Sequence, residues 1–235
     1  MKRLKIISVF LFCVAVCLTF GYVFSKEPEW VAASTRIDCG RTIIIDAGHG
    51  GYDGGAVAED GTPEKDINLC IAKDLKAFLE LFNYNVVMTR ESDKSTESDN
   101  GKNSWKTSDL YNRLQLMNKY DDAIYVSIHL NKFTSTNVSG AQTFYSQKSE
   151  NSEQLALSIH GKIISMLQPE NTREIKKGTN SIYLLRNATC PAVIVECGFL
   201  SNREELEKLK TEKYQRMMAF CIFCGIMDYN NALRL

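Results

Sequence analysis

The sequence predicts an α/β fold, in which one domain contains a twisted, mostly parallel sheet flanked by helices. Along the chain, short stretches rich in β-branched and aromatic residues alternate with stretches whose apolar residues recur at helical spacing. The stretch at 42–45 contains three consecutive isoleucines and that at 123–128 is almost entirely apolar, which is typical of strands buried on both faces. A length of 235 residues is sufficient for one such domain with a large core.

The first part of the domain is expected to form two strands joined by a long helix. Thr62 suits the N-cap of that helix and Pro63 its first position, because threonine accepts a hydrogen bond from a free N–H and proline has no N–H to lose. From there to Phe82, apolar residues recur on one face. The expected elements are a strand at 42–45, a helix at 64–82 and a strand at 85–89.

The second part continues the alternation after a polar loop, at 91–107, that is rich in serine, aspartate, asparagine and lysine. Strands that alternate with helices favour a parallel sheet covered on both faces. Helices are expected at 108–119, 151–167, 203–210 and 213–229, and strands at 123–128, 141–145, 181–185 and 192–195.

The N-terminus carries a targeting segment that is separate from the fold. Lys2, Arg3 and Lys5 precede an uncharged apolar run from Ile6 to about Phe24, which suits a signal peptide or a single membrane span. The basic flank stays in the cytoplasm, so the domain is expected outside the membrane. We divide the chain into a signal peptide or membrane anchor at 1–25, with an anchor preferred, a linker at 26–41 and the folded domain at 42–230.

Charge and cysteine usage narrow the function classes. The chain has 28 basic and 28 acidic residues, so no basic excess supports nucleic-acid binding. Export permits disulfides, but the spacing of the cysteines shows no disulfide framework. Cys221 and Cys224 form a C-x-x-C pair inside an apolar predicted helix, which favours buried thiols over a redox or zinc pair.

Four polar side chains are expected at one edge of the sheet. His49 follows the first strand within a glycine loop, His129 ends the strand at 123–128, and Glu196 ends the strand at 192–195. Glu64 lies in the first turn of a helix and leans back toward the same edge. Two imidazoles and one carboxylate are a ligand set of catalytic zinc, and a remaining carboxylate is the general base that such a site needs.

Each of these residues also has a simpler structural interpretation. Glu64 alone could complement the dipole at a helix N-terminus. His129 could be a hydrogen-bonded core histidine, and Glu196 could pair with an arginine. The candidates for that pairing are Arg90, Arg113 and Arg186. We favour the shared site because four such coincidences at one edge are improbable; His160, in the middle of a predicted helix, is given no role.

Four ordered motifs in the sequence resemble those of the zinc-dependent N-acetylmuramoyl-L-alanine amidases, the Amidase_3 family. The resemblance extends from about Thr42 to Tyr229, with Thr89, Arg90 and Arg113 also matching. It implies a single α/β domain of phosphorylase/hydrolase-like fold and one Zn²⁺ bound by three of the residues identified above, with the fourth as the catalytic base. The motifs are IIDAGHGG at 44–51, EKDINL at 64–69, SIHLN at 127–131 and VECGFLSN at 195–202.

On this resemblance, the metal ligands are His49, Glu64 and His129, and Glu196 is catalytic. The substrate is peptidoglycan, and the bond broken is the amide between N-acetylmuramic acid and L-alanine of the stem peptide. The N-terminal segment followed by one catalytic domain without wall-binding repeats is similar to the germination-specific, spore-cortex type. That similarity implies a step toward muramic-δ-lactam, in the space between the membranes of a forming spore.

Other functions remain as alternatives at this stage. They are a vegetative cell-wall amidase, a catalytically weak wall-binding protein that requires a partner, and another zinc hydrolase of the wall such as a peptidase or deacetylase. The absence of a long insertion after Tyr145 favours a site that is not blocked by its own chain, with control by expression, zinc loading or a regulatory or scaffold protein partner. A dinucleotide site is excluded because Asp53 occupies the third glycine position, and no G-x-S-x-G motif is present for a serine hydrolase.

Overall fold

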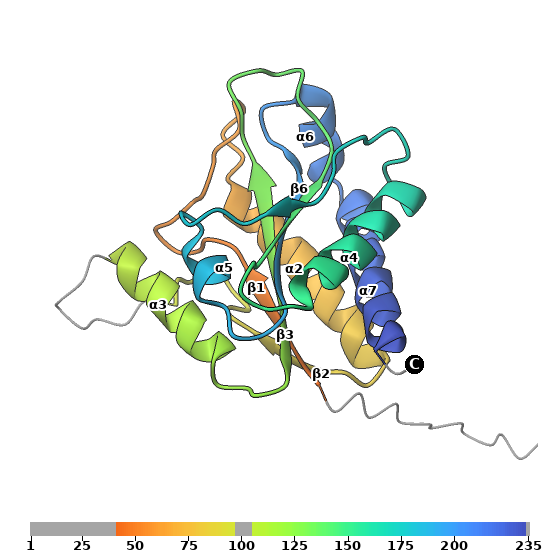
Figure 1. Ribbon diagram of the computed structural model, residues 1–235. Coiled ribbons are helices and arrows are strands. Elements are labelled where there is room, and N and C mark those ends of the chain that lie inside the picture. The colour runs from red at the N-terminus through yellow and green to blue at the C-terminus, as the bar shows by residue number, and fades with distance from the viewer. Residues whose placement is uncertain (1–40, 97–104, 234–235) are drawn as a thin grey trace, which may run out of the picture. The chain divides into compact units, whose positions relative to one another are not determined.

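The computed structural model describes residues 41–96 and 105–233, which form a six-stranded sheet with helices on both faces (Figure 1). The α/β prediction is therefore confirmed. The strands are β1 Thr42–Ala47, β2 Asn85–Met88, β3 Ala123–Asn131, β4 Gln142–Tyr145, β5 Lys176–Lys177 and β6 Ala192–Phe199. The helices are α2 Glu64–Leu81, α3 Trp105–Met117, α4 Ser152–Met166, α5 Tyr183–Asn187, α6 Arg203–Leu209 and α7 Glu212–Ala232.

The sheet has the strand order β2-β1-β3-β6-β4-β5 and is mostly parallel. Among the six described strands, β4 and β6 form the one antiparallel pair. Because β4 runs against β6, its amino end and the loop before it open at the edge where β1, β3 and β6 end. This arrangement brings loops from both halves of the chain to one edge of the sheet.

Side-chain alternation in β1 divides the core into two apolar layers. Ile43 and Ile45 are fully buried against the layer that α2, α4 and α7 complete, and Ile44 is fully buried in the opposite layer with residues of α3 and α5. Both faces of the central strands are therefore dry, which is why β1 is a continuous apolar run rather than an alternating one.

Helix α2 begins at Glu64, as the predicted range of 64–82 has it, but its cap differs from the prediction. Pro63 is its cap residue, with φ −83° and ψ 143°, and Glu64 is the first helical residue; no side chain caps this end. Thr62 as the N-cap and Pro63 as the first helical residue are therefore wrong. Pro63 remains extended because it forms a bridge with Val57, while the backbone N–H of Glu64 donates to Ala56 O at 2.8 Å.

Residues 181–185, predicted as a strand, do not form one. Helix α5 begins at Tyr183, and the N–H of Arg186 donates to Ile182 O at 3.0 Å. Leu184 and Leu185 are both buried in the apolar layer that contains α3. This tertiary packing outweighs the β-propensity of Ile182 and Tyr183.

Several element boundaries also differ from the prediction. Strand β5 was not predicted, because its two exposed lysines carry no apolar pattern. Helix α3 starts at Trp105, inside the stretch predicted as a loop, of which 97–104 lie outside the described residues. Strand β6 continues past Glu196 to Phe199 instead of ending at Glu196.

The predicted signal or anchor at 1–25 and nearly all of the linker at 26–41 lie outside the described residues. Among the helices that are described, none combines the length and apolar character needed to cross a membrane. All five cysteines in the described ranges are free thiols. Cys221 is buried and Cys224 half-buried, in agreement with the interpretation of this pair as thiols inside a helix.

Candidate metal centre and active site

The first part of the site is the glycine loop after β1. The N–H of Gly48 donates to Ile128 O at 3.0 Å, so the loop begins in register with β3. His49 then adopts a left-handed backbone with φ 62°, which is uncommon for a residue other than glycine. The backbone groups of Gly50 and Asp53 pair with each other and close the turn.

Two arginines hold this loop through its carbonyl oxygens. Arg90 donates to Ala47 O at 2.9 Å and to Gly48 O at 3.0 Å. Arg113 donates to His49 O at 2.8 Å and forms a buried ion pair with Asp46. Burial opposes ionisation of Asp46, but the Arg113 charge and the neighbouring side chains of Ser127, Tyr125 and His129 together outweigh it and hold the pKa of this carboxyl well below its usual range. The unusual conformation of His49 is thus imposed by buried, charged hydrogen bonds.

Glu64 is the central residue of the site. Its side chain is 3% exposed and accepts three hydrogen bonds from the surrounding protein. Oε2 accepts from Ala56 N at 2.9 Å, and Oε1 accepts from Leu130 N at 3.0 Å and from Asn68 Nδ2 at 3.1 Å. A carboxylate with this many donors is fixed in position and stays ionised.

His49 and His129 approach Glu64 from two different strands. His49 Nε2 lies 3.2 Å from Glu64 Oε2, and His129 Nδ1 lies 2.9 Å from Glu64 Oε1. Burial raises the pKa of Glu64, but the two histidines outweigh it and hold that pKa well below its usual range. Burial likewise lowers the pKa of His129, but Glu64 outweighs it and raises that pKa to about 9. Asp53 Oδ2 lies 2.8 Å from His49 Nδ1 and so orients the ring.

Glycines provide the space in which the two rings and the carboxylate meet. A Cβ atom on Gly48 would lie 2.4 Å from atoms of the His129 ring. A Cβ atom on Gly55 would lie 2.6 Å from Glu64 Oε2 and from His49 Cδ2. Any larger residue at Gly48 or Gly55 would therefore displace a member of the cluster.

The cluster fits a zinc ion by donor type and by spacing. One ligand atom each from His49, Glu64 and His129 lies within 4.8 Å of the others. Nitrogen and oxygen ligands of a tetrahedral zinc lie about 2 Å from the ion and so roughly 3.3 Å from one another. His49 Nε2 lies 3.2 Å from Glu64 Oε2, close to that value, and His129 Nδ1 lies 2.9 Å from the other oxygen of the same carboxylate, Oε1. The Asp53 carboxylate on the far nitrogen of His49 is the outer-shell partner that metal-binding histidines commonly have.

Glu196 lies beside this cluster without belonging to it. In the sheet register its Cα is paired with His129 on one side and with Gln142 on the other. Its Oε2 atom is buried and has no hydrogen-bond partner within the described part of the chain. Burial raises the pKa of Glu196 to about 6, with the charge of Glu64 adding to the rise and that of His129 opposing it. A buried carboxylate with a pKa near neutrality suits a group that accepts and returns a proton.

Two of the simpler interpretations given above are not supported by these contacts. None of the three candidate arginines forms an ion pair with Glu196 in the residues that the structure describes. Glu64 does more than complement a helix end, because both of its oxygens contact the histidines. His160 lies elsewhere, buried in α4 with Nε2 donating to Arg173 O at 2.7 Å.

Sequence analysis did not identify Asp53 or Asn68 as part of the site. Both follow a recognised site residue by four positions, Asp53 after His49 and Asn68 after Glu64. For Asn68, the spacing along a helix was a usable signal, because residues four apart lie on the same face. For Asp53 no such signal exists, since the loop conformation brings the two side chains together.

The fold and this cluster together define a class of hydrolase, and comparison with known proteins identifies the family. The family model for N-acetylmuramoyl-L-alanine amidases matches residues 43–228. The chain therefore belongs to the N-acetylmuramoyl-L-alanine amidases, peptidoglycan hydrolases that cleave the bond between N-acetylmuramic acid and L-alanine.

The individual relatives that the chain resembles cover 80–97% of it. The germination-specific N-acetylmuramoyl-L-alanine amidase of Bacillus subtilis (strain 168) is 38% identical over 230 residues, which are 97% of this chain and 95% of the relative. The solved structure of the CwlD amidase from Clostridioides difficile in complex with the GerS lipoprotein has a TM-score of 0.78 and 38% identity, covering 81% of this chain and 98% of that one. The solved structure of the N-acetylmuramoyl-L-alanine amidase AmiC2 of Nostoc punctiforme has a TM-score of 0.70 and 30% identity. The match covers 80% of this chain and 96% of that one.

Proposed function

We propose that this protein is a zinc-dependent amidase that removes stem peptides from the peptidoglycan of the spore cortex, a step toward muramic-δ-lactam and germination. The observation that carries the proposal is the convergence of His49, Glu64 and His129 beside a buried carboxylate, Glu196, that has an unpartnered oxygen. The cortex role is supported by the similarity to the germination-specific amidase of Bacillus subtilis. A vegetative-wall amidase is the alternative.

His49, Glu64 and His129 would hold the metal, each through one ligand atom. Zinc in such a site polarises a carbonyl oxygen and makes water acidic enough to lose a proton near neutral pH. The protein keeps the three ligands in place before the substrate arrives, because Asp53 orients His49 and three donors fix Glu64. Little rearrangement is then needed when the substrate binds.

Glu196 would act as the catalytic base. It takes a proton from the attacking water and passes it to the nitrogen of L-alanine, which leaves as an amine. Its pKa of about 6 suits both steps, because the carboxylate is mostly ionised at neutral pH and its conjugate acid readily gives the proton up. Its buried Oε2 atom has no hydrogen-bond partner among the described residues, which leaves that oxygen available to the proton.

The remaining parts of the proposal concern location and partners. We propose that residues 1–25 export the chain and anchor it or are cleaved, that 26–41 form a linker, and that 42–230 act outside the cytoplasm. The protein would then meet peptidoglycan in the space between the membranes of a forming spore. The CwlD relative was solved in complex with a lipoprotein, which supports a regulatory or scaffold protein partner for this chain as well.

The test is cleavage of purified peptidoglycan by the full-length protein, with and without added zinc, followed by mass spectrometry of the products. We expect free peptides that begin with L-alanine, released from cortex-type more readily than from vegetative peptidoglycan. Chelation should abolish release. Glu196→Gln should lower kcat by roughly 10²–10⁴-fold while the protein still binds zinc, because this side chain is outside the metal cluster.

The outcomes separate the competing functions. Cleavage by Glu196→Gln at the wild-type rate would exclude Glu196 as the base. Cleavage within the peptide or removal of acetyl groups would indicate another wall hydrolase. Peptidoglycan binding without cleavage, in protein that contains zinc, would support the catalytically weak binding protein that needs a partner.

A further inference from the structure

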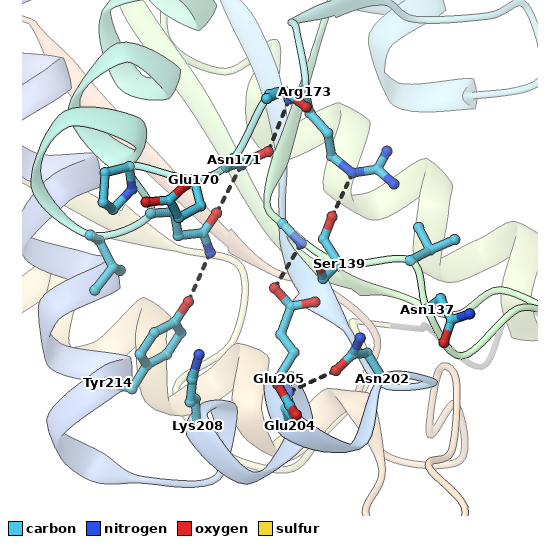
Figure 2. Close-up of a pocket in the computed structure, with 16 residues that line it drawn as sticks. Asn137, Ser139, Glu170, Asn171, Arg173, Asn202, Glu204, Glu205, Lys208 and Tyr214 are labelled. Atoms are coloured by element: carbon cyan, nitrogen blue, oxygen red, sulfur yellow. Dashed lines mark hydrogen bonds between the residues drawn. The ribbon is translucent and has the colours of Figure 1, made fainter.

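A cavity opens at the same edge of the sheet as the metal cluster. It has a volume of about 590 Å³ and is lined by the β3–β4 loop, the α4–β5 loop, α6 and the start of α7 (Figure 2). Since β4 is antiparallel to β6 and β5 is parallel to β4, the loops that precede β4 and β5 lie at the edge where β6 ends. The cavity is therefore next to the strand that carries Glu196.

Arg173 is the cationic side chain that the surrounding residues hold most firmly in this cavity. Its Nε donates to Ser139 O at 2.8 Å and its backbone N–H donates to Asn171 Oδ1 at 3.0 Å (Figure 2). The guanidinium carbon lies 4.6 Å from the centre of the Phe199 ring, at the end of β6. The carbonyl of Arg173 accepts from buried His160. These contacts fix the arginine before any ligand binds.

Arg173 is connected to β6, the strand of Glu196, through Gln142 on the neighbouring strand β4. Arg173 Nη1 donates to Gln142 Oε1 at 3.3 Å, and Gln142 is 4% exposed. Gln142 is the register partner of Glu196, and side chains of directly opposite residues lie on the same face of a sheet. Arg173 is thus separated from the catalytic carboxylate by one residue.

The positive charge of Arg173 is not neutralised by an ion pair. No carboxylate oxygen lies within 4.0 Å of its guanidinium in the ranges that the structure describes. The buried carboxylate of Glu205, which lines the same cavity, uses its oxygens for the N–H groups of Gly140, at 2.9 Å, and Phe199, at 2.7 Å. Among the described residues, Nε and Nη1 of Arg173 have hydrogen-bond partners and Nη2 has none. A guanidinium held in this way presents the planar fork that binds a carboxylate through two hydrogen bonds.

We infer that Arg173 binds a free carboxylate of the stem peptide, two or three residues beyond the bond that is cleaved. This inference rests on the proposed function, because it assumes that the peptide leaves the metal cluster across β6. Neighbouring strands lie about 4.8 Å apart, and an extended peptide advances about 3.3–3.6 Å per residue. The second and third residues of a stem peptide carry such carboxylates, so Arg173 makes the enzyme selective for acidic stems.

The experiment measures peptide binding separately from cleavage. Calorimetric titration of the full-length protein would compare L-alanyl-γ-D-glutamyl-diaminopimelate with the same peptide whose free carboxylates are converted to carboxamides. Wild type should bind the acid form at least tenfold more tightly. Arg173→Gln should bind the two forms equally, and Arg186→Gln is the matched control, because Arg186 also stacks on an aromatic ring but lies outside the cavity.

Equal affinity of wild type for the two peptides would overturn the inference, as would full discrimination by Arg173→Gln. If that variant fails to fold, Arg173→Lys decides, since it keeps the charge but not the fork and should lose most of the discrimination. Cleavage of peptidoglycan is scored separately. If the protein cleaves peptidoglycan but binds the two peptides equally, the role of Arg173 is wrong and the amidase function stands. If it discriminates between the peptides but does not cleave peptidoglycan, the amidase function is wrong and the carboxylate-binding role of Arg173 stands.

Discussion

Gly48 provides the most direct test of how the metal cluster is built. Its backbone conformation does not require glycine, but a Cβ at this position would lie 2.4 Å from Cε1 and Nε2 of His129. Ordinary van der Waals contact begins at 3.4 Å, so the ring would have to move by 3.4 − 2.4 = 1.0 Å. We therefore expect Gly48→Ala to damage the site while leaving the fold intact.

The size of the effect follows from the contacts that the ring would lose. His129 Nδ1 lies 2.9 Å from Glu64 Oε1, and a shift of about 1 Å would move the ring out of the position in which the three side chains converge. Mutation of an outer-shell partner that only orients a ligand costs about 10–100-fold in metal affinity, so displacement of a proposed ligand should cost at least as much. A misplacement of about 1 Å in an active site can cost about 10²-fold in rate. We expect losses of this order in zinc affinity and in peptidoglycan cleavage.

The assay compares Gly48→Ala with Gly54→Ala, a matched control in the same loop. A Cβ on Gly54 would meet only Pro63 Cβ, at 3.9 Å, so this variant should behave as wild type. Zinc affinity by competition with a chromogenic chelator, cleavage rate and Tm would be measured for both. Wild-type zinc affinity and activity in Gly48→Ala, or equal damage in the two variants, would refute the reasoning.

Three further predictions concern stability. Because the pKa of Asp46 in the folded protein lies below its ordinary value of 3.8, the ionised carboxylate stabilises the fold above about pH 4, and this stabilisation is lost in acid. Asp46→Asn should lower the free energy of unfolding at pH 7 by about 3–5 kcal/mol and give a Tm that depends less on pH below 4. Glu205→Gln should lose about 1–3 kcal/mol in denaturant titrations, because the amide NH₂ faces a backbone N–H of Gly140 or Phe199; wild-type stability would contradict this. Chelation should lower Tm by several degrees in the wild type, and an unchanged Tm would argue against a bound metal.

The central strands and the long helices could be predicted from the sequence because their signals are local. Continuous apolar runs at β1 and β3 and a single apolar face on α2 are visible without tertiary information. The conformation of 181–185 could not be predicted in this way. Leu184 and Leu185 suit a strand or a helix equally by sequence, and the apolar layer that they pack against decides between them. The two-residue strand β5 could not be predicted either, because its exposed lysines show no apolar pattern and join the sheet only by pairing with β4.

The candidate site was predicted for a different reason, which is topology. His49 and His129 each lie at or just past the end of a strand, and parallel strands end at one edge, so their meeting follows from the fold class. The contributions of Asp53 and of the cavity at Arg173 depend instead on loop conformation and on the reversed direction of β4. Neither is encoded in a periodic pattern.

The left-handed backbone of His49 has a consequence for engineering this protein. Such a conformation costs a residue with a side chain about 1–2 kcal/mol, and glycine or asparagine tolerates it better. A thermostability screen that rewards folding alone would therefore enrich glycine or asparagine at position 49 and discard a proposed metal ligand. Libraries of this enzyme should be selected with zinc loading as a second criterion, since the most stable backbone and the functional one differ at this residue.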